Sequence, residues 1–177
     1  MYQLLISLDN ITPSITRTIT VPEKITLNKL HRVIQAVMGW KNYHLYYFDV
    51  WEDKIGDLLL WDDYPADDNL IQIEDKLITI GDTLSYMYDM GDSWCHTITL
   101  EAILPDTPES KIQCLEASRA CPPEDCGGIT GYYDILRILD HFGTEEYNEM
   151  MVWLDGWHPE NIILGNINRR LKKFKME

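Results

Sequence analysis

The sequence predicts an α+β domain with a largely antiparallel sheet, an early amphipathic helix and a C-terminal helical part. Three observations support this class. Strand-like alternation dominates residues 1–103, a Pro-, Gly- and Cys-rich segment covers 104–131, and helical spacing of apolar residues returns over 132–177. The chain has 177 residues, of which 45% are hydrophobic, and this suits one globular domain. We therefore expect a single domain over residues 1–177.

The first two strands and the first helix have the clearest signals. Residues 2–8 are largely apolar and end at a turn, and residues 15–21 alternate between threonine and mostly aliphatic side chains, which predicts an antiparallel pair. Thr26 is a typical N-cap, apolar residues follow at helical spacing to Met38, and Gly39 stands just past the end. This stretch predicts the amphipathic helix.

Further strands are predicted over residues 44–51, 84–88 and 94–101, where aromatic and β-branched residues are frequent. A short link that contains a glycine joins the last two strands, so we expect a β-hairpin. The period of two along 94–101 places Trp94 and His96 on the same apolar face.

The second half is predicted to change from loop to helix. Residues 104–131 are expected to form a long irregular loop, and such a loop in a compact domain is usually functional or clamped. Residues 132–139 and 145–154 have helical spacing. A last helix is predicted from Pro159 to Lys173, because proline is common in the first helical turn.

The charge is strongly negative, with 29 acidic residues, 15 basic residues and a net charge of -14. Five of the basic residues lie in the last nine positions: Arg169, Arg170, Lys172, Lys173 and Lys175. An acidic body repels phosphate backbones, so nucleic acid is not the expected partner. We expect a protein partner, and a basic surface would complement this chain.

The sequence gives no sign of a membrane span or of secretion. No apolar run approaches the ~18 residues that a membrane helix needs, and the start lacks the basic segment of a signal peptide. We therefore expect a cytoplasmic protein in a reducing compartment, where disulfides are rare.

Two interpretations are open for the polar residues of the predicted hairpin. Asp89 and Asp92 flank its turn, and His96 lies one short step along the strand. They are either turn-forming aspartates and a core histidine, or a cluster in which His96 acts as ligand or general base. In the second case Glu124 and Asp125 complete the site from the long loop.

Three cysteines of the long loop are weak metal candidates. The spacing Cys114-x6-Cys121-x4-Cys126 lacks the paired knuckles of structural zinc sites. We expect no metal and no cofactor, with small buried thiols as the ordinary interpretation. A zinc site made by these cysteines and His96 is the alternative.

The loop also carries candidate binding residues. Backbone amides around Gly127 and Gly128, leading into a helix at Tyr132, suit either an anion nest or a structural clamp. We count these three residues, together with His44 and Trp94, as candidates for binding.

Two long motifs resemble the plasmid pRiA4b ORF-3-like family. They are residues 88–96, Tyr-Asp-Met-Gly-Asp-Ser-Trp-Cys-His, and residues 119–128, Arg-Ala-Cys-Pro-Pro-Glu-Asp-Cys-Gly-Gly, followed by Gly131-Tyr132. The resemblance extends upstream to Met38-Gly39-Trp40 and downstream to Trp157-His158-Pro159, and so covers nearly the whole chain. The family also occurs as a passenger protein of a bacterial insertion element, with a resolvase-like label.

The resemblance implies a compact α+β domain of prokaryotic, cytoplasmic proteins without an established activity. The resolvase label does not fit the residues, because a serine recombinase needs a nucleophilic serine among arginines and Ser7 has none beside it. We expect an accessory or protein-interaction domain associated with plasmids and mobile elements. The alternative is a metal-dependent or acid/base, hydrolase-like enzyme with its cluster around His96.

Overall fold

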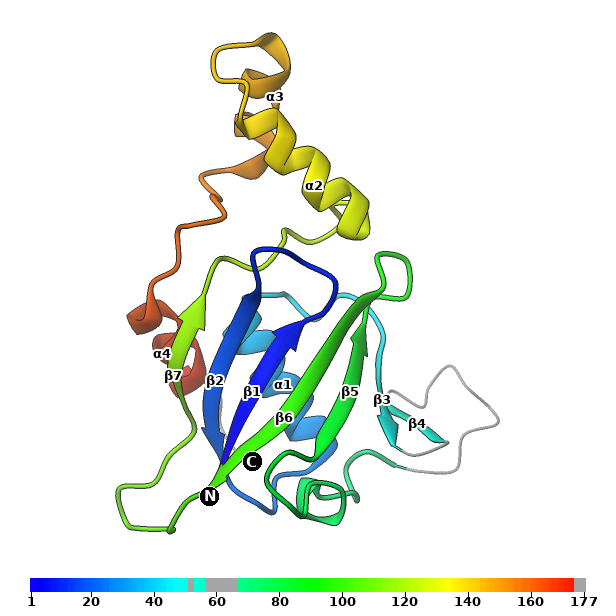
Figure 1. The fold of residues 1–177 in the computed structure, drawn as a ribbon, viewed down its shortest axis with the longest axis vertical. Helices are drawn as coiled ribbons and strands as arrows, with labels where there is room; N and C mark the ends of the chain where they lie inside the picture. The colour runs from blue at the N-terminus through cyan, green and yellow to red at the C-terminus, as the bar shows by residue number, and fades with distance from the viewer. Residues whose placement is uncertain (51–52, 57–66, 174–177) are drawn as a thin grey trace.

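The computed structural model describes residues 1–50, 53–56 and 67–173. One seven-stranded sheet forms the body, in the order β4-β3-β5-β6-β1-β2-β7, and all six neighbouring pairs are antiparallel (Figure 1). The strands are β1 Tyr2–Leu8, β2 Ile15–Val21, β3 Tyr46–Val50, β4 Asp53–Gly56, β5 Thr83–Tyr88, β6 Trp94–Ile103 and β7 Gln113–Ser118. The predicted α+β class is confirmed.

The alternation of the strands decides which side chains enter the core. β1 pairs with β2 and with β6, and β5 pairs with β6 through the predicted hairpin. On β2 the residues at odd positions are buried, which places Arg17 among aliphatic side chains on the core face. On β6 Trp94 and His96 lie on the same face, as predicted, and both are buried.

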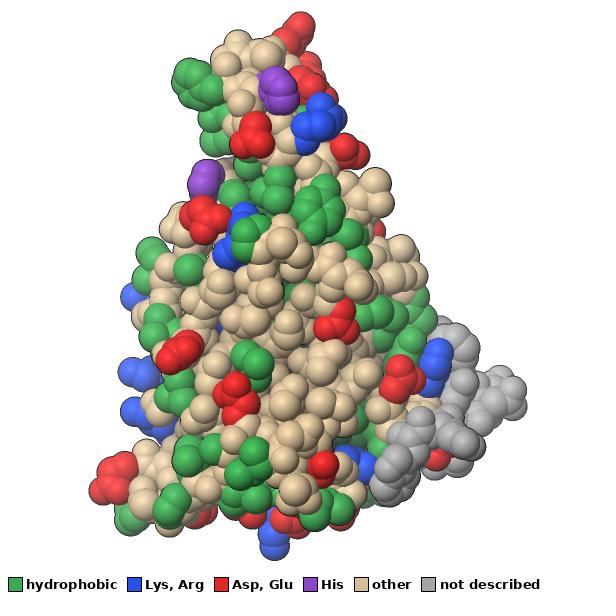
Figure 2. Space-filling view, in the orientation of Figure 1, with side chains coloured by type: hydrophobic (Ala, Val, Ile, Leu, Met, Phe, Trp, Pro, Cys, Tyr) green, Lys and Arg blue, Asp and Glu red, His purple; other side chains and the backbone are tan. Residues whose placement is uncertain are grey.

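Two helices cover the core face of the sheet. The predicted amphipathic helix is α1 Leu27–Met38, which starts at the N-cap Thr26 and ends at Gly39 in the left-handed conformation. The last helix, α4 Leu164–Lys173, packs against α1 and β7 through the buried Ile167 and Leu171. No helix of the described part of the chain lies over the other face of the sheet, which Figure 2 shows from the front.

The helices α2 Gly128–Leu139 and α3 Glu145–Leu154 form a hairpin that projects from one end of the sheet (Figure 1). Leu154 is the buried residue of α3, so this helix contributes little to the core. The short 3-10 helix η2 Ile73–Asp75 completes the elements of the described residues.

The structure corrects three predicted boundaries. The segment 104–131 is not all loop, because β7 joins the edge of the sheet beside β2 within it. α2 begins at Gly128, earlier than the predicted 132. The last helix begins at Leu164, whereas Pro159 accepts a hydrogen bond from the Ala120 amide and belongs to the connection before it.

Some residues used in the sequence analysis lie outside the described ones: Trp51, residues 57–66 and Lys175. Among the described residues, no helix is long and apolar enough to cross a membrane.

Candidate functional site

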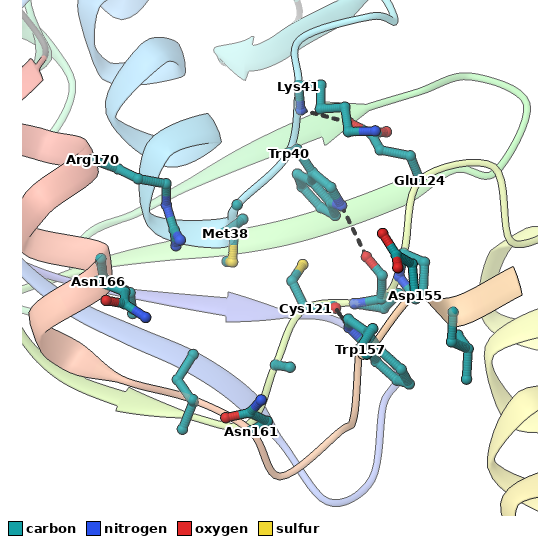
Figure 3. Close-up of a pocket in the computed structure, with 18 of the residues that line it drawn as sticks. Met38, Trp40, Lys41, Cys121, Glu124, Asp155, Trp157, Asn161, Asn166 and Arg170 are labelled. Carbon is teal, nitrogen blue, oxygen red and sulfur yellow. Dashed lines mark hydrogen bonds between the residues drawn. The ribbon is translucent and has the colours of Figure 1, made fainter. Parts of the chain in front are cut away.

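Three segments that are distant in sequence meet at one end of the sheet. They are the connection from α1 to β3, the β5–β6 turn and the loop before α2. Trp40 Nε1 donates to the Pro122 carbonyl at 3.2 Å (Figure 3). The Gly127 amide donates to Asp92 Oδ2, also at 3.2 Å. The two motifs that carry the family resemblance are therefore in contact.

One imidazole and three carboxylates converge where these segments meet. His44 Nε2 lies 3.5 Å from Asp89 Oδ2, 3.7 Å from Glu124 Oε2 and 3.2 Å from Asp125 Oδ1. His44 Nε2 is shielded from solvent and has no hydrogen-bond partner among the described residues, so none of these contacts has hydrogen-bond geometry. The ring nitrogen therefore points into the space that the carboxylates share.

The backbone holds the two buried carboxylates in place. Asp89 Oδ1 accepts from the amides of Gly91 at 2.8 Å and Asp92 at 3.3 Å, which leaves Oδ2 for His44. Glu124 Oε1 accepts from the Lys41 amide at 2.7 Å (Figure 3). Such contacts orient ligands in metal centres.

Tyr88 supports the same cluster from the sheet. Its hydroxyl donates to Glu124 Oε1 at 3.1 Å and accepts from the Tyr43 amide at 3.1 Å. Burial, together with the Glu124 charge, raises the pKa of Tyr88 above its usual value, so this phenol stays protonated at neutral pH. Its ring packs on Trp40 at 4.8 Å and on His44 at 5.8 Å between centroids.

The cluster has a buried side and an open side. The Asp89 and Glu124 side chains are 8% and 11% exposed, whereas Asp125 is 70% exposed. One ligand atom from each of His44, Asp89 and Asp125 lies within 4.8 Å of the others. Solvent or a ligand can thus reach the cluster from the side of Asp125.

These distances suit a divalent cation. Metal–ligand bonds of about 2.0–2.2 Å place neighbouring donor atoms of a tetrahedral ion about 3.3–3.6 Å apart. The contacts of His44 Nε2 with Asp89 and Asp125 lie near this range, and these three residues form the group whose ligand atoms all lie within 4.8 Å of one another. Glu124 lies outside that group, with Oε2 3.7 Å from His44 Nε2. A donor set of one imidazole nitrogen and carboxylate oxygens fits zinc, manganese or ferrous iron. The positive charge would also offset the repulsion among the carboxylates.

His96 lies in the core and not in the cluster. The side chain is fully buried, Nδ1 lies 3.4 Å from the Tyr86 carbonyl oxygen, and the ring meets Trp40 edge-on at 5.2 Å between centroids. Burial lowers the pKa of His96 to about 4, so its ring is neutral at physiological pH. His44, a binding candidate by sequence, occupies the central position instead.

Of the other candidate residues, some join the hairpin turn to the loop and the others pack in the core. Asp92 ties the hairpin turn to the loop through Gly127. A Cβ on Gly128 would lie 2.7 Å from the Asp92 carbonyl oxygen, so glycine is required for this approach. Trp94 and Tyr132 are fully buried and pack in the core.

The cysteines are all free, and they do not assemble with His96 into a ligand group within the described part of the chain. Burial raises the pKa of Cys114 to about 11 and that of Cys126 to about 12, and raises that of Cys121 further. These thiols therefore stay protonated at neutral pH, as packing residues do.

A groove of about 740 Å³ opens beside the cluster on the helix-covered side of the sheet (Figure 3). Glu124 and Asp125 line one end, Trp40 and Trp157 line the walls, and Arg170 of α4 lines the far end. A second cavity, of about 510 Å³, is lined by His44 and shares Tyr43 with the groove. Residues of the cluster thus line both hollows.

Sequence reasoning missed Lys41 and Tyr88 as supports of the cluster. Lys41 contributes a backbone amide, and any residue type except proline carries one, so the sequence has no signal for it. Tyr88 starts the first long motif, and its place beside Asp89 was a usable signal.

Comparison with known proteins agrees with this architecture. The profile of the plasmid pRiA4b ORF-3-like protein family matches residues 1–165. The uncharacterised protein y4hQ of Sinorhizobium fredii is 35% identical over 153 residues, which are 85% of this chain and 79% of that protein. A crystal structure of MM3350 from Methanosarcina mazei Go1, a protein of unknown function, has a TM-score of 0.85 and 36% identity, and the match covers 93% of this chain and 96% of that one. None of these relatives indicates a cofactor. The chain belongs to the plasmid pRiA4b ORF-3-like family.

Proposed function

We propose that this protein is a hydrolase that depends on a divalent cation, with its centre at His44, Asp89, Glu124 and Asp125. The observation that carries the proposal is the convergence of these four side chains from three separate segments beside a groove. It replaces the predicted cluster around His96 by one around His44.

Each residue of the centre has a distinct task in this proposal. His44 offers a ring nitrogen, the buried Asp89 supplies a fixed oxygen, and the exposed Asp125 supplies another and leaves one side open. The buried Glu124 lies beside them as a further acceptor. A bound divalent cation supplies a Lewis acid and lowers the pKa of coordinated water, which is the chemistry of hydrolytic metal sites. Tyr88 holds Glu124 in place as a hydrogen-bond donor, because burial and the Glu124 charge raise the pKa of this phenol and keep it protonated.

Titration calorimetry with zinc and with manganese tests the cation site. We expect one ion per chain, with Asp89→Asn at least about tenfold weaker because a charged ligand is lost while Oδ1 can still accept from Gly91. The control is Asp134→Asn, which removes an exposed α2 carboxylate that contacts Arg137. Equal binding by both variants, or no binding by the wild type, would reject the centre. His44 would then lie beside the carboxylates without a cation to hold.

A protein-interaction role is the second candidate, because the α2–α3 hairpin exposes large apolar side chains. Phe142 is 84% exposed, Val152 82% and Trp153 51%. Acidic side chains gather around the same hairpin (Figure 2). An apolar surface with an acidic surround suits a basic, amphipathic partner, in an accessory role beside plasmid or mobile-element proteins.

This second role has its own test. The wild type and a Phe142→Ser, Val152→Ser variant serve as baits in a lysate of the host. A specific partner should bind the wild type, dissociate in high salt because opposite charges are screened, and be absent from the variant bait. A partner retained equally by both baits would exclude this surface.

A cytoplasmic location is also part of the proposal. The four free cysteines, with Cys114 and Cys121 buried, suit a reducing compartment. Fractionation of the host cell tests this directly, and recovery in the periplasmic or secreted fraction would contradict it.

A further inference from the structure

The far end of the groove carries positive charge without a counterion. Arg170 Nε donates to the Ala36 carbonyl at 2.7 Å, and its guanidinium lies against Gly39 where α1 ends. Among the described residues, no carboxylate forms an ion pair with Arg170. The terminal nitrogens of this arginine therefore face the groove with N–H groups that can still donate (Figure 3).

A second guanidinium, that of Arg17, adds positive charge close to Arg170. Arg17 is fully buried, donates to the carbonyls of Thr16, Val37 and Ser118, and leaves Nη2 without a partner among the described residues. Burial lowers the pKa of Arg17, and the nearby charge of Arg170 adds to the effect. Burial likewise lowers the pKa of Arg170. An anion bound at Arg170 would add a favourable charge interaction for both guanidinium groups.

The side chains near Arg170 suit a ligand that carries an amide and a flat or apolar group. Asn166 precedes Arg170 by one turn of α4, so the two side chains lie on the same helix face. Asn161 lines the groove beside them (Figure 3). Trp157 donates its ring N–H to the Cys121 carbonyl at 2.8 Å, which leaves its ring surface for packing.

We propose that the groove binds a peptide C-terminus, with the carboxylate on Arg170, the last peptide group at Asn161 and Asn166, and the last side chain against Trp157. The proposal names the ligand class of the cation centre and so rests on the proposed function. The peptide would run from Arg170 toward Glu124 and Asp125, where the cation centre begins.

Charge favours a carboxylate over a phosphate at this end. The chain carries a net charge of -14, and Glu124, Asp125 and Asp155 line the same groove. A dianion meets twice the repulsion of a monoanion from these groups. A planar guanidinium binds a carboxylate through two parallel hydrogen bonds.

Nuclear magnetic resonance of the full chain in chelator tests the peptide without the metal. The probes are an equimolar library of acetylated tripeptides with free C-termini and the same library amidated. The free acids should shift the Arg170 Nε–H and Trp157 Nε1–H signals, and the amides should need at least about tenfold higher concentration, because the charge-assisted pair is lost. Equal shifts with both libraries, or shifts with neither, would overturn the proposal.

Matched variants locate the site and separate the two proposals. Arg170→Gln should abolish the response to the free acids, whereas Lys172→Gln, which removes an exposed cation of α4 outside the groove lining, should keep it. Asp89→Asn should also keep it in chelator, since the cation ligands are not needed for this step. Peptide binding without any cation binding would leave this inference standing and reject the proposed function. The reverse result would reject this inference alone. A stronger response to inorganic phosphate than to the free acids would also overturn it.

Discussion

At the scale of single residues, the structure depends on a close contact where the loop enters α2, between the first turn of the helix and the backbone just before it. A Cβ on Gly131 would overlap the carbonyl oxygen of Cys126, and that backbone atom has no flexible side chain that can move aside. Gly131→Ala should therefore lower the free energy of unfolding by about 3 kcal/mol or more.

Urea unfolding measures this change, and Gly165→Ala is its control. Nothing lies within 4 Å of a Cβ at Gly165 in α4, so alanine there should raise stability by up to about 1 kcal/mol. Equal effects of the two substitutions would show that the contact at Gly131 is not tight. The glycines of the motif mark this region in the sequence, but they do not say which glycine meets which carbonyl.

The buried His96 gives a second prediction at this scale. Its pKa is about 4 in the folded protein, against 6.5 for an unperturbed histidine such as that of the unfolded chain. Between these two values the unfolded state binds a proton that the folded state does not. Stability should therefore fall as pH drops from about 6.5 to 4, by up to about 2 kcal/mol between pH 7 and 5.

Urea titrations at pH 7, 6 and 5 check this dependence. His96→Gln removes one of two histidines whose pKa burial lowers to about 4, the other being His31, so it should remove about half of the slope. His141→Gln, which changes an exposed histidine after α2, is the control for the loss of any histidine. The same slope in the wild type and in His96→Gln would mean that other groups control the acid sensitivity.

At the scale of elements, β2, β7 and the end of α1 are joined through Arg17. This guanidinium donates to the Thr16, Ser118 and Val37 carbonyls without a carboxylate partner among the described residues. Arg17→Met fits the same space but removes all three of these hydrogen bonds. We expect a loss of about 2–4 kcal/mol, because the cost of losing them exceeds the gain from removing a buried charge.

Thermal and urea unfolding should be measured for both Arg17→Met and Arg137→Met. The comparison distinguishes the loss of the Arg17 hydrogen bonds from the loss of an arginine in general. Arg137 is exposed on α2 and pairs with Asp134 and Glu146, so its replacement should change stability by less than about 1 kcal/mol. A stable Arg17→Met would show that the carbonyls find water or other donors.

An element can be predicted from the sequence when its signals are local to that element. α1 is predictable because Thr26, the apolar spacing and Gly39 are all local signals. β7 escapes prediction because it is an edge strand with one partner, and its sequence Gln-Cys-Leu-Glu-Ala-Ser lacks a clear alternation. The predicted start of the last helix is wrong because Pro159 suits a first helical turn but instead serves a long-range hydrogen bond to Ala120.

At the scale of the whole molecule, the candidate centre depends on tertiary contacts that no local pattern contains. Asp89, Glu124 and Asp125 are candidates by residue type, yet their assembly around His44 follows from contacts such as that between Trp40 and Pro122. Residue types alone define a set of polar candidates. The fold then decides which of them lie together, and it places His96 in the core, outside the cluster.

Because the centre joins three segments, a bound cation should stabilise the whole fold. An ion that binds the folded state alone, at 100 times its dissociation constant, adds about 2.7 kcal/mol. For a chain of this size that raises the melting temperature by about 5–10 °C. Zinc should therefore shift the wild type and Asp134→Asn by this amount but shift Asp89→Asn, whose binding is at least about tenfold weaker, by about half as much or less, as measured by calorimetric melting with and without chelator. If Asp89→Asn shifted as far as the wild type, the ion would be bound elsewhere. If zinc lowered the melting temperature of all three proteins, it would prefer the unfolded chain, whose cysteines become accessible, and the proposed centre would not be its site.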